Sequence, residues 1–475
     1  MSQLVEDCLR IIFAELQDDS NSLYSCILVN RFWCRIGVPI LWKNPFIHNY
    51  EKGLKLCDAI ISLLPTSSKQ LLFDNNIDIP LPIFSNQPLF NYISFSSKIP
   101  HDFINQMLTL IDGDERTVLF KRNLLEREVY KLFVDNCKNI KNFYWKTPQP
   151  LPQYQGALNC FSQLQTLNVD LRFVTSISLF EMAQICQKVE DLQLWICNGD
   201  LPGLIDFIDG QKSLQSLFLY FNGVKQCVRL SEVIKRKAAT LKRFTIMPIL
   251  ITLSPKFLPS LTNLERLELN NDNGFNDECK KMKEWKKYLS IAALPNLQYL
   301  EFGFLPFSEE YMLVEKSNGN LLEIIIYHAD QYRDSVNAEK LVRAIAKYCP
   351  KIEKLEIDVE FENLDGIKEI YLNCTQLKEI YLSMINLEGL ICDKLLEITA
   401  NFSPGTLHVF SFNDSWNFSV NGLQLFFENW KNRNRNPLGF MKYSDDSDYF
   451  FGEEHGSVIS KYYDEGTIKE TNCLF

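Results

Sequence analysis

Hydrophobic and polar positions follow a short recurring phrase, apolar-x-x-apolar-x-apolar, between about residues 140 and 412. The phrase is clearest at Leu264, Leu267 and Leu269. The last two apolar residues are two positions apart, so they point to the same side of an extended chain. Each phrase therefore predicts a short strand that buries one side, while the first apolar residue turns inward as the chain enters the strand. The phrases fall at Ile140/Phe143/Trp145, Leu164/Leu167/Val169, Val189/Leu192/Leu194, Leu214/Leu217/Leu219, Leu241/Phe244/Ile246, Leu264/Leu267/Leu269, Leu297/Leu300/Phe302, Leu321/Ile324/Ile326, Ile352/Leu355/Ile357, Leu377/Ile380/Leu382 and Leu407/Phe410/Phe412.

Successive phrases begin 23 to 33 residues apart, and the apolar spacing between them changes to a helical period. Leu341, Ala344, Ile345 and Tyr348 give an example of the helical spacing. A self-similar period of this length is typical of a leucine-rich-repeat solenoid, in which each unit supplies one strand and one helix. We expect an α/β horseshoe with parallel strands on its concave face and helices on its convex face. The alternative is chance matching in a chain rich in Leu, Ile and Phe, and the near-regular spacing argues against it.

A cysteine precedes four of the phrases by three residues, at Cys137, Cys186, Cys349 and Cys374. This placement resembles the cysteine-containing subclass of leucine-rich repeats, in which the thiol packs beneath the next strand. We therefore expect these four thiols to be buried and structural. Because nothing at the N-terminus resembles a signal peptide, the cysteines are interpreted as reduced thiols and the protein as cytoplasmic or nuclear.

Residues 1–45 form a separate helical unit in the sequence. Its first helix carries Leu9, Ile12, Phe13 and Leu16 on one face and is expected to stop near Asp18. A second helix is expected to begin with Asn21 or Ser22 as its cap, and a third carries Phe32 and Trp33 before Pro39. A core this small is not expected to bury its own apolar side chains, which predicts a partner surface.

The residues from Leu4 to Leu9, followed by Ile12-Phe13, Leu16, Leu23, Cys26, Val29-Asn30, Trp33 and Pro39 to Trp42, resemble an F-box. An F-box docks onto an Skp-type adaptor of cullin ubiquitin ligases. Val5 stands where such motifs commonly have proline, so the usual rigidity at the first helical turn is missing. The alternative is a plain helical cap on the solenoid. The resemblance implies adaptor binding through Leu4, Leu9, Ile12, Phe13, Leu16, Leu23, Val29 and Trp33.

The remaining segments are less regular. Residues 46–139 are interpreted as a linking region with degenerate repeats, because Phe90, Ile93 and Phe95 fit the phrase loosely. The solenoid is assigned to residues 140–440, and residues 441–475 to a C-terminal capping segment with an acidic tail. Val458–Tyr463 is expected to form a final strand. A lysine cluster between residues 280 and 287 is interpreted as a solvated helix or loop in preference to a binding patch.

Composition excludes several function classes. A net charge of −10 and a pI near 5.3 argue against a nucleic-acid groove. The five histidines have no partners at metal-ligand spacing, and no phosphate-binding loop or nucleophile elbow is present. We expect no catalytic residue, no metal, no cofactor and no membrane or nucleic-acid partner.

The phrase also predicts which side chains face away from the core. Residues that flank the buried strand positions should form a row across neighbouring strands, rich in aromatic and acidic groups. The alternative is that other segments of the chain cover some of them. The residues expected to bind a target are Trp195, Phe218, Tyr220, Glu268, Tyr299, Glu301, Glu323, Tyr327, Glu356, Asp358, Glu379 and Tyr381.

Taken with the F-box resemblance, these features imply the substrate-recognition subunit of a cullin-type ubiquitin ligase. The adaptor would link it to cullin and RING subunits, and the repeats would hold an unknown target protein. Two alternatives remain open: a repeat scaffold for protein–protein interaction outside ubiquitin transfer, and an enzyme whose site carries no recognisable motif.

Overall fold

The computed structural model describes residues 6–43, 50–77, 88–109, 111, 115–271, 280–305, 310–328, 335–384, 390–413, 415–433, 436–443 and 451–473. The chain divides into two compact units. The first contains Met1–Ile196 and Leu201–Leu214, and the second contains Cys197–Asp200 and Gln215–Phe475. The expected acidic tail at residues 444–448 lies outside the described residues.

The N-terminal helices are α1 (Glu6–Glu15), α2 (Ser20–Ile27) and α3 (Arg31–Leu41). The α2 cap is Asp19, whose carboxylate accepts the Ser22 N–H, so the expected cap at Asn21 or Ser22 is wrong by two or three residues. The Asn30 side chain caps α3 by accepting the Trp33 N–H at 2.9 Å. Helix α3 continues through Pro39 and ends two residues later, at Leu41.

These helices do bury an apolar core of their own, which corrects the expectation that they are too small to do so. Leu9, Phe13, Leu23 and Ile36 are at most 1% exposed. Phe13 also meets Trp33 edge to face, with ring centroids 5.4 Å apart. Burial of four large apolar side chains contributes roughly 6–12 kcal/mol before conformational entropy is subtracted. The helical unit therefore has an apolar interior of its own.

The described residues between 50 and 136 form helices and no strand. They are α4 (Tyr50–Leu63), α5 (Thr66–Asp74), the 3-10 helix η1 (Tyr92–Phe95), α6 (His101–Thr109) and α7 (Glu115–Asn136). The segment around Ile93, which was expected to be a degenerate repeat strand, is the 3-10 helix. Ile93 is buried, but the backbone of this segment is a 3-10 helix and not a strand, so the repeat interpretation of this segment is wrong.

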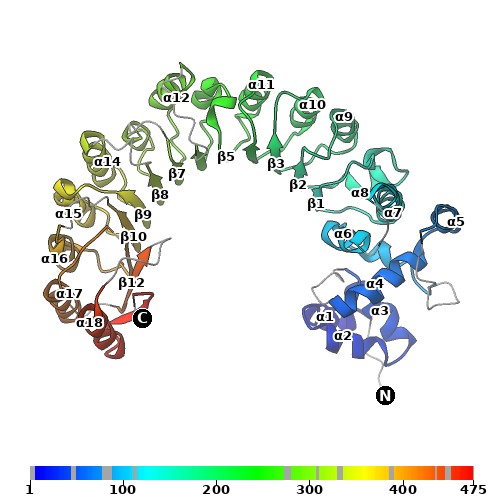
Figure 1. Cartoon of the computed structure of the whole chain (residues 1–475), viewed down its shortest axis with the longest axis horizontal. Coiled ribbons are helices and arrows are strands. Elements are labelled where there is room, and N and C mark those ends of the chain that lie inside the picture. Colours follow the sequence, from blue (N-terminus) through cyan, green and yellow to red (C-terminus); the bar gives the residue numbers. More distant parts are fainter. Residues whose placement is uncertain are drawn as a thin grey trace. The chain divides into compact units, whose positions relative to one another are not determined.

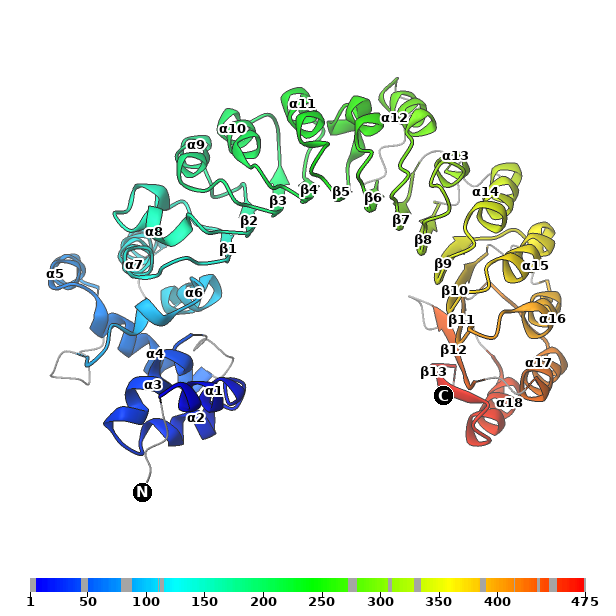
Figure 2. The same cartoon turned by 180° about the vertical axis from the view of Figure 1, so that it is seen from behind.

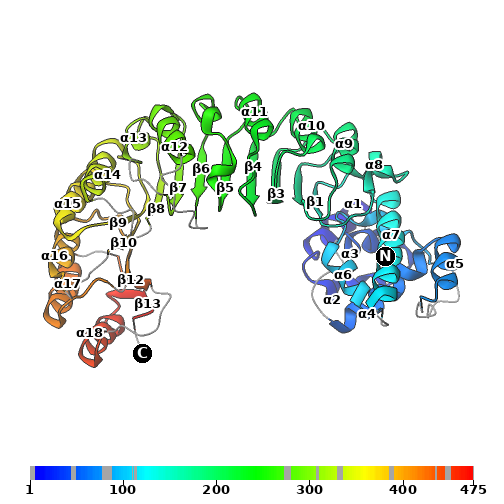
Figure 3. The same cartoon turned by 45° about the horizontal axis from the view of Figure 1, so that its top comes forward.

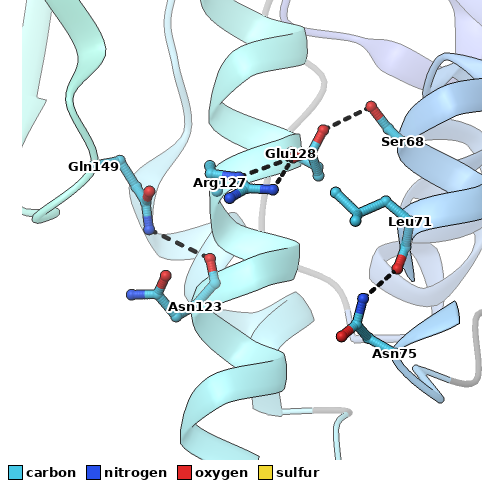
Figure 4. A network of polar contacts seen from close by, with 7 residues as sticks. All are labelled: Ser68, Leu71, Asn75, Asn123, Arg127, Glu128 and Gln149. Atoms are coloured by element: carbon cyan, nitrogen blue, oxygen red, sulfur yellow. Dashed lines mark hydrogen bonds and ion pairs between the residues drawn. The ribbon is translucent and has the colours of Figure 1, made fainter. Parts of the chain in front are cut away.

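A polar network joins α5, α7 and the segment that follows β1 (Figure 4). The buried Glu128 carboxylate on α7 accepts a hydrogen bond from the Ser68 hydroxyl at 2.7 Å and one from Arg127 Nε at 2.9 Å. Gln149 donates to the Asn123 carbonyl at 3.3 Å and to Glu126 at 3.1 Å. Buried carboxylates are stable only when their oxygens have such donors. The network therefore fixes α7 against its neighbours on both sides.

Thirteen strands in the described part of the chain form a parallel sheet in sequence order. Each of the eleven phrases coincides with one of the first eleven strands, which confirms the predicted α/β solenoid fold. The strands are β1 (Asn142–Trp145), β2 (Thr166–Asp170), β3 (Asp191–Cys197), β4 (Ser216–Phe221), β5 (Arg243–Met247), β6 (Arg266–Asn270), β7 (Tyr299–Gly303), β8 (Glu323–Tyr327), β9 (Lys354–Asp358), β10 (Glu379–Ser383), β11 (Val409–Asn413), β12 (Leu438–Tyr443) and β13 (Ile468–Thr471).

Helices or 3-10 turns connect successive strands. In the second unit the helices line one face of the strands and leave the other face of β4–β11 without a helix (Figures 1 and 2). The connecting elements are η2 (Leu151–Gln153), α8 (Ala157–Phe161), α9 (Ser176–Ile185), α10 (Pro202–Gly210), α11 (Val228–Lys237), η3 (Leu250–Thr252), η4 (Pro255–Ser260), α12 (Lys280–Ile291), α13 (Tyr311–Val314), α14 (Ser335–Tyr348), η6 (Phe361–Asn363), α15 (Leu364–Asn373), α16 (Asp393–Phe402), α17 (Val420–Asn432) and α18 (Glu453–Asp464).

The core lies between the strands and these helices. The three apolar positions of each phrase are buried, as at Leu264, Leu267 and Leu269, which have no exposed surface. Identical positions stack in register, so that Leu267 lies opposite Leu300 and Leu269 opposite Phe302. Cys137, Cys186, Cys349 and Cys374 are also buried free thiols, which confirms their structural placement.

The C-terminal end differs from the expectation. Val458–Tyr463 belongs to helix α18, and the closing strands are β12 and β13 on either side of it. Ile459 and Tyr462 are the buried residues of this helix, and their spacing of three matches a helical period better than a strand. The lysine cluster lies on α12, where Lys283, Lys286 and Lys287 are exposed and Trp285 is buried, as expected of a solvated helix face.

Candidate functional site

The first candidate surface is on the N-terminal helices. Of the residues predicted to bind an adaptor, Leu9, Phe13 and Leu23 lie in the interior of the helical unit, and Leu16 and Trp33 pack against that interior. Ile12 and Val29 are exposed. Leu4 lies outside the described residues. A partner could therefore reach Ile12 and Val29 directly, but it could not reach the three buried residues without opening the core.

Further apolar side chains are exposed on these helices, and the sequence interpretation did not include them in its site. They are Ile11 on α1, Tyr24 on α2, Leu28 at the end of α2 and Phe32 on α3. Leu28 is 67% exposed and Val29 59%; both lie between α2 and α3, and Phe32 follows in the first turn of α3. Together with Ile12 and Val29 they form what we call the N-terminal apolar set. In these helices the residues next to the buried positions are also apolar. The apolar periodicity alone therefore did not distinguish the buried face of each helix from its exposed face.

The second candidate surface is the open sheet face. We define it by the outward side chains of β4–β10. These strands belong to the second unit, and Figure 3 shows them side by side. Strand register arranges these side chains in rows. One row runs Arg266, Tyr299, Glu323, Lys354 and Glu379, and the next runs Glu268, Glu301, Ile325, Glu356 and Tyr381.

The predicted target-binding residues are mostly on this face and half-buried, as outward residues of a sheet should be. Asp358 is the exception, at 8% exposure. Trp195 lies on β3 in the first unit, so it is not part of the open sheet face as defined on β4–β10. The half-buried residues are Trp195, Phe218, Tyr220, Glu268, Tyr299, Glu301, Glu323, Tyr327, Glu356, Glu379 and Tyr381.

Glu268 on β6 has a cationic partner. Its carboxylate accepts a hydrogen bond from Arg266 Nε and another, at 3.1 Å, from the Thr245 hydroxyl of β5. The Arg266 guanidinium also stacks on the Tyr299 ring of β7, 3.4 Å from its centroid. The negative charge of Glu268 is therefore balanced by Arg266 within the open sheet face.

Glu301 and Glu356 have neutral donors. The Tyr299 hydroxyl donates to Glu301, and Tyr327 donates to Glu356. Burial raises the pKa of the Tyr299 hydroxyl, and its hydrogen bond to Glu301 raises it further, so the tyrosine remains a donor at every physiological pH. A phenol orients a carboxylate without neutralising its charge.

Burial raises the pKa of the Glu356 carboxyl. The Tyr327 hydrogen bond and the charge of Lys354 lower this pKa, and the weaker effects of Glu301 and Asp358 raise it, so burial is the main cause of the upward shift. A raised carboxyl pKa means that the ionised form is poorly compensated in its surroundings. The Tyr327 donor and the Lys354 charge thus compensate only part of the cost of burying the Glu356 carboxylate.

Asp358 is withdrawn from the open sheet face by His328. Its Oδ2 accepts the His328 backbone N–H at 2.8 Å and lies 3.3 Å from the ring Nδ1. The other ring nitrogen is 3.2 Å from Glu310 Oε1. Asp358 is therefore a structural anion, which corrects its assignment to the target surface. The His328 side chain is thus buried, with partners at both ring nitrogens.

The far end of the face combines aromatic and charged groups. The Tyr381 hydroxyl donates to Glu379 at 3.2 Å, and Lys354 Nζ lies 5.3 Å from the Tyr381 ring centroid. Burial raises the pKa of Tyr381 to about 12, with the charge of Glu379 adding to the effect. Such alternation of rings and charges suits a protein or peptide partner, because aromatic residues supply contact area and charges supply selectivity.

Among the described residues, no group of histidine, cysteine and acidic side chains has the geometry to hold a metal ion. No helix in the described ranges is long and apolar enough to cross a bilayer.

No protein-family model matches the chain, and no curated protein matches it either. Among solved structures, the leucine-rich-repeat-containing protein LegL7 from Legionella pneumophila is 13% identical, with a TM-score of 0.31, and the match covers 71% of this chain and 93% of that one. A protein from Bacteroides fragilis is 13% identical, with a TM-score of 0.28, over 61% of this chain and 68% of the other.

Proposed function

We propose that this protein is a target receptor of an SCF-type cullin ubiquitin ligase. In this proposal the N-terminal helices bind an Skp-type adaptor and the open sheet face binds the target. The F-box resemblance from Leu4 to Trp42 supports the first contact. The observation that carries the second is the face of β4–β10, which has no covering helix among the described residues and displays aromatic and acidic side chains.

The physical role of such a receptor is to raise a local concentration. A chain that holds adaptor and target at once makes ubiquitin transfer by other subunits effectively intramolecular. The receptor itself then needs a binding surface and no catalytic group. Its selectivity depends on the outward side chains, because the buried positions of the repeats are committed to the fold.

The adaptor contact is assigned to the N-terminal apolar set in place of the buried core residues. Leu28 and Val29 are adjacent, strongly exposed and outside the Leu9–Phe13–Leu23 interior. Placing a carboxylate at each position in an apolar interface costs several kcal/mol, enough to abolish a micromolar complex. The same substitution on a solvated surface has little effect on folding.

The test is co-purification of the full chain with an Skp-type adaptor. We expect the wild type to retain the adaptor and Leu28→Asp with Val29→Asp to lose it by at least about a hundredfold, or ~3 kcal/mol. Leu372→Asp on α15 is the matched control, because Leu372 is also a largely exposed leucine, at 55%. Wild-type recovery of adaptor by the double variant, or no adaptor with the wild type, would sink the proposal.

A scaffold outside ubiquitin transfer is the second candidate, and the self-contained core of the helical unit favours it. Leu9, Phe13, Leu23 and Ile36 already bury one another, as a plain helical cap would require. Such a scaffold would capture targets through the open sheet face and show no adaptor in the same co-purification.

A further inference from the structure

Three residues lie directly opposite one another at the centre of the open sheet face. Glu301 on β7 faces Ile325 on β8, and Ile325 faces Glu356 on β9. Neighbouring strands are about 4.8 Å apart, so the two glutamate Cα atoms are separated by roughly 10 Å. Ile325 is buried to 7% exposure and provides an apolar floor between two half-buried carboxylates.

Both carboxylates are held in place before any partner arrives. Tyr299 donates to Glu301, and Tyr327 donates to Glu356. Tyr299 is fixed in turn by the stacked Arg266 guanidinium. Side chains that are already oriented lose little conformational entropy on binding.

The cations on this face do not neutralise the pair. Arg266 forms its hydrogen bond with Glu268, one strand away from Glu301. Lys354 lies over the Tyr381 ring, and its charge lowers the pKa of Glu356 without offsetting the effect of burial. The five glutamates on β6–β10 thus exceed the two cations on the same strands. A positive group between Glu301 and Glu356 would relieve their mutual repulsion.

We propose that Glu301, Ile325 and Glu356 bind an arginine side chain of an extended segment of the target protein. The proposal rests on the open sheet face being the target surface. The guanidinium would lie between the two carboxylates, with its planar face on Ile325 and Tyr hydroxyls behind each acid. Arginine fits better than lysine because its head group is planar, weakly hydrated and able to donate to two acceptors at once.

The experiment measures binding of the full chain to immobilised peptides of twelve residues. Each peptide has one arginine among Ser, Thr and Val, and matched copies carry citrulline or lysine at that position. We expect the citrulline copies to bind at least about tenfold more weakly, since each charge-assisted hydrogen bond is worth about that factor. Lysine copies should bind severalfold more weakly than the arginine peptides.

The protein variants isolate the site. Glu301→Gln with Glu356→Gln should lower arginine-peptide binding at least about tenfold while leaving the peptide backbone contacts intact. Glu268→Gln is the matched control, because this acid lies in the same row but already has Arg266 as a partner. It should change binding less than about twofold.

The proposal is overturned by any of three results: equal binding of arginine and citrulline peptides, equal binding of arginine and lysine peptides, or wild-type binding by the double variant. Absence of binding to every peptide overturns it too. These measurements need no adaptor, so failure of the adaptor contact is a separate outcome. An arginine site can be demonstrated even where co-purification finds no Skp-type protein.

Discussion

The imidazole Nδ1 of His328 lies 3.3 Å from Oδ2 of Asp358, thirty residues later in the chain. The same carboxylate oxygen accepts the His328 backbone N–H, and Glu310 holds the opposite side of the ring. His328 follows β8, Asp358 ends β9 and Glu310 precedes α13. The buried His328 side chain thus connects consecutive repeats. The strength of its contacts with the two carboxylates depends on whether the imidazole is protonated.

We predict that this contact makes stability depend on pH. Burial lowers the pKa of His328, but the hydrogen bonds and charges of Asp358 and Glu310 raise it to about 9, above the value of 6.5 for a free histidine. A raised pKa gives stabilisation that is fully present below about pH 6.5 and is lost as the pH rises through about 9. The loss should be on the order of 2–3 kcal/mol.

The measurement is a series of denaturant midpoints between pH 6 and pH 9.5. His328→Gln should flatten the decline relative to the wild type, because the group that titrates is gone. His408→Gln is the control, since the side-chain hydrogen bond of the His408 ring is local, with the Thr406 carbonyl two residues earlier. An identical pH profile in the wild type and His328→Gln would contradict the prediction.

The polar network of α7 gives a prediction for the first unit. Ser68→Ala removes the hydroxyl donor from the buried Glu128 and leaves that oxygen without its 2.7 Å partner. We expect a loss of about 1–3 kcal/mol and a lower melting temperature, because a buried acceptor loses its donor. Ser62→Ala is the control, since the Ser62 hydroxyl bonds only to the Ala59 carbonyl of its own helix. Equal melting temperatures for both variants would contradict the role given to Glu128.

The repeats could be predicted from sequence because their determinants are local. Leu267 and Leu269 are two residues apart, and that spacing alone requires one buried face for a strand. Asp358 could not be assigned correctly, because its position in the phrase matches that of true outward residues. Its partner His328 lies 30 residues earlier, and Glu310, which holds the other side of the His328 ring, lies 48 residues earlier, so nothing in the spacing identifies either residue.

The prediction of which side chains are exposed on the N-terminal helices was wrong in part, for another reason. Apolar residues such as Ile11, Ile12 and Phe13 follow one another there, so the sequence carries no clear polar face to separate inside from outside. Similarly, Ile459 and Tyr462 point into the core from a helix, although the segment also contains the β-branched residues typical of a strand. Only packing against the preceding elements decides between these arrangements.

Thiol reactivity tests the repeat register. Burial raises the pKa of Cys137, Cys186, Cys349 and Cys374 to about 12 in each case. We expect these thiols to react slowly with a thiol reagent at pH 8, both because the thiolate is scarce and because the reagent cannot reach it. Cys8 is exposed and should react in the first phase. Peptide mapping by mass spectrometry assigns each rate, and fast native labelling of the four would contradict their placement beneath the strands.

The tightest helix contact in the first unit predicts a difference between two glycines of α10. A Cβ at Gly203 would lie 1.8 Å from the Ser176 carbonyl oxygen at the start of α9, whereas a Cβ at Gly210 would lie 3.9 Å from its nearest neighbour, the Ala183 oxygen. Gly203 also donates its N–H to the Ser176 hydroxyl at 2.8 Å. Gly203→Ala must therefore push the two helices apart, at a cost of about 1–3 kcal/mol. Gly210→Ala should be neutral or stabilising by about 0.5–1 kcal/mol, because alanine favours the helix.

Thermal melting followed by circular dichroism measures the stability of both variants. A Gly203→Ala protein that melts with or above Gly210→Ala would show that α9 and α10 do not approach as closely as this geometry requires.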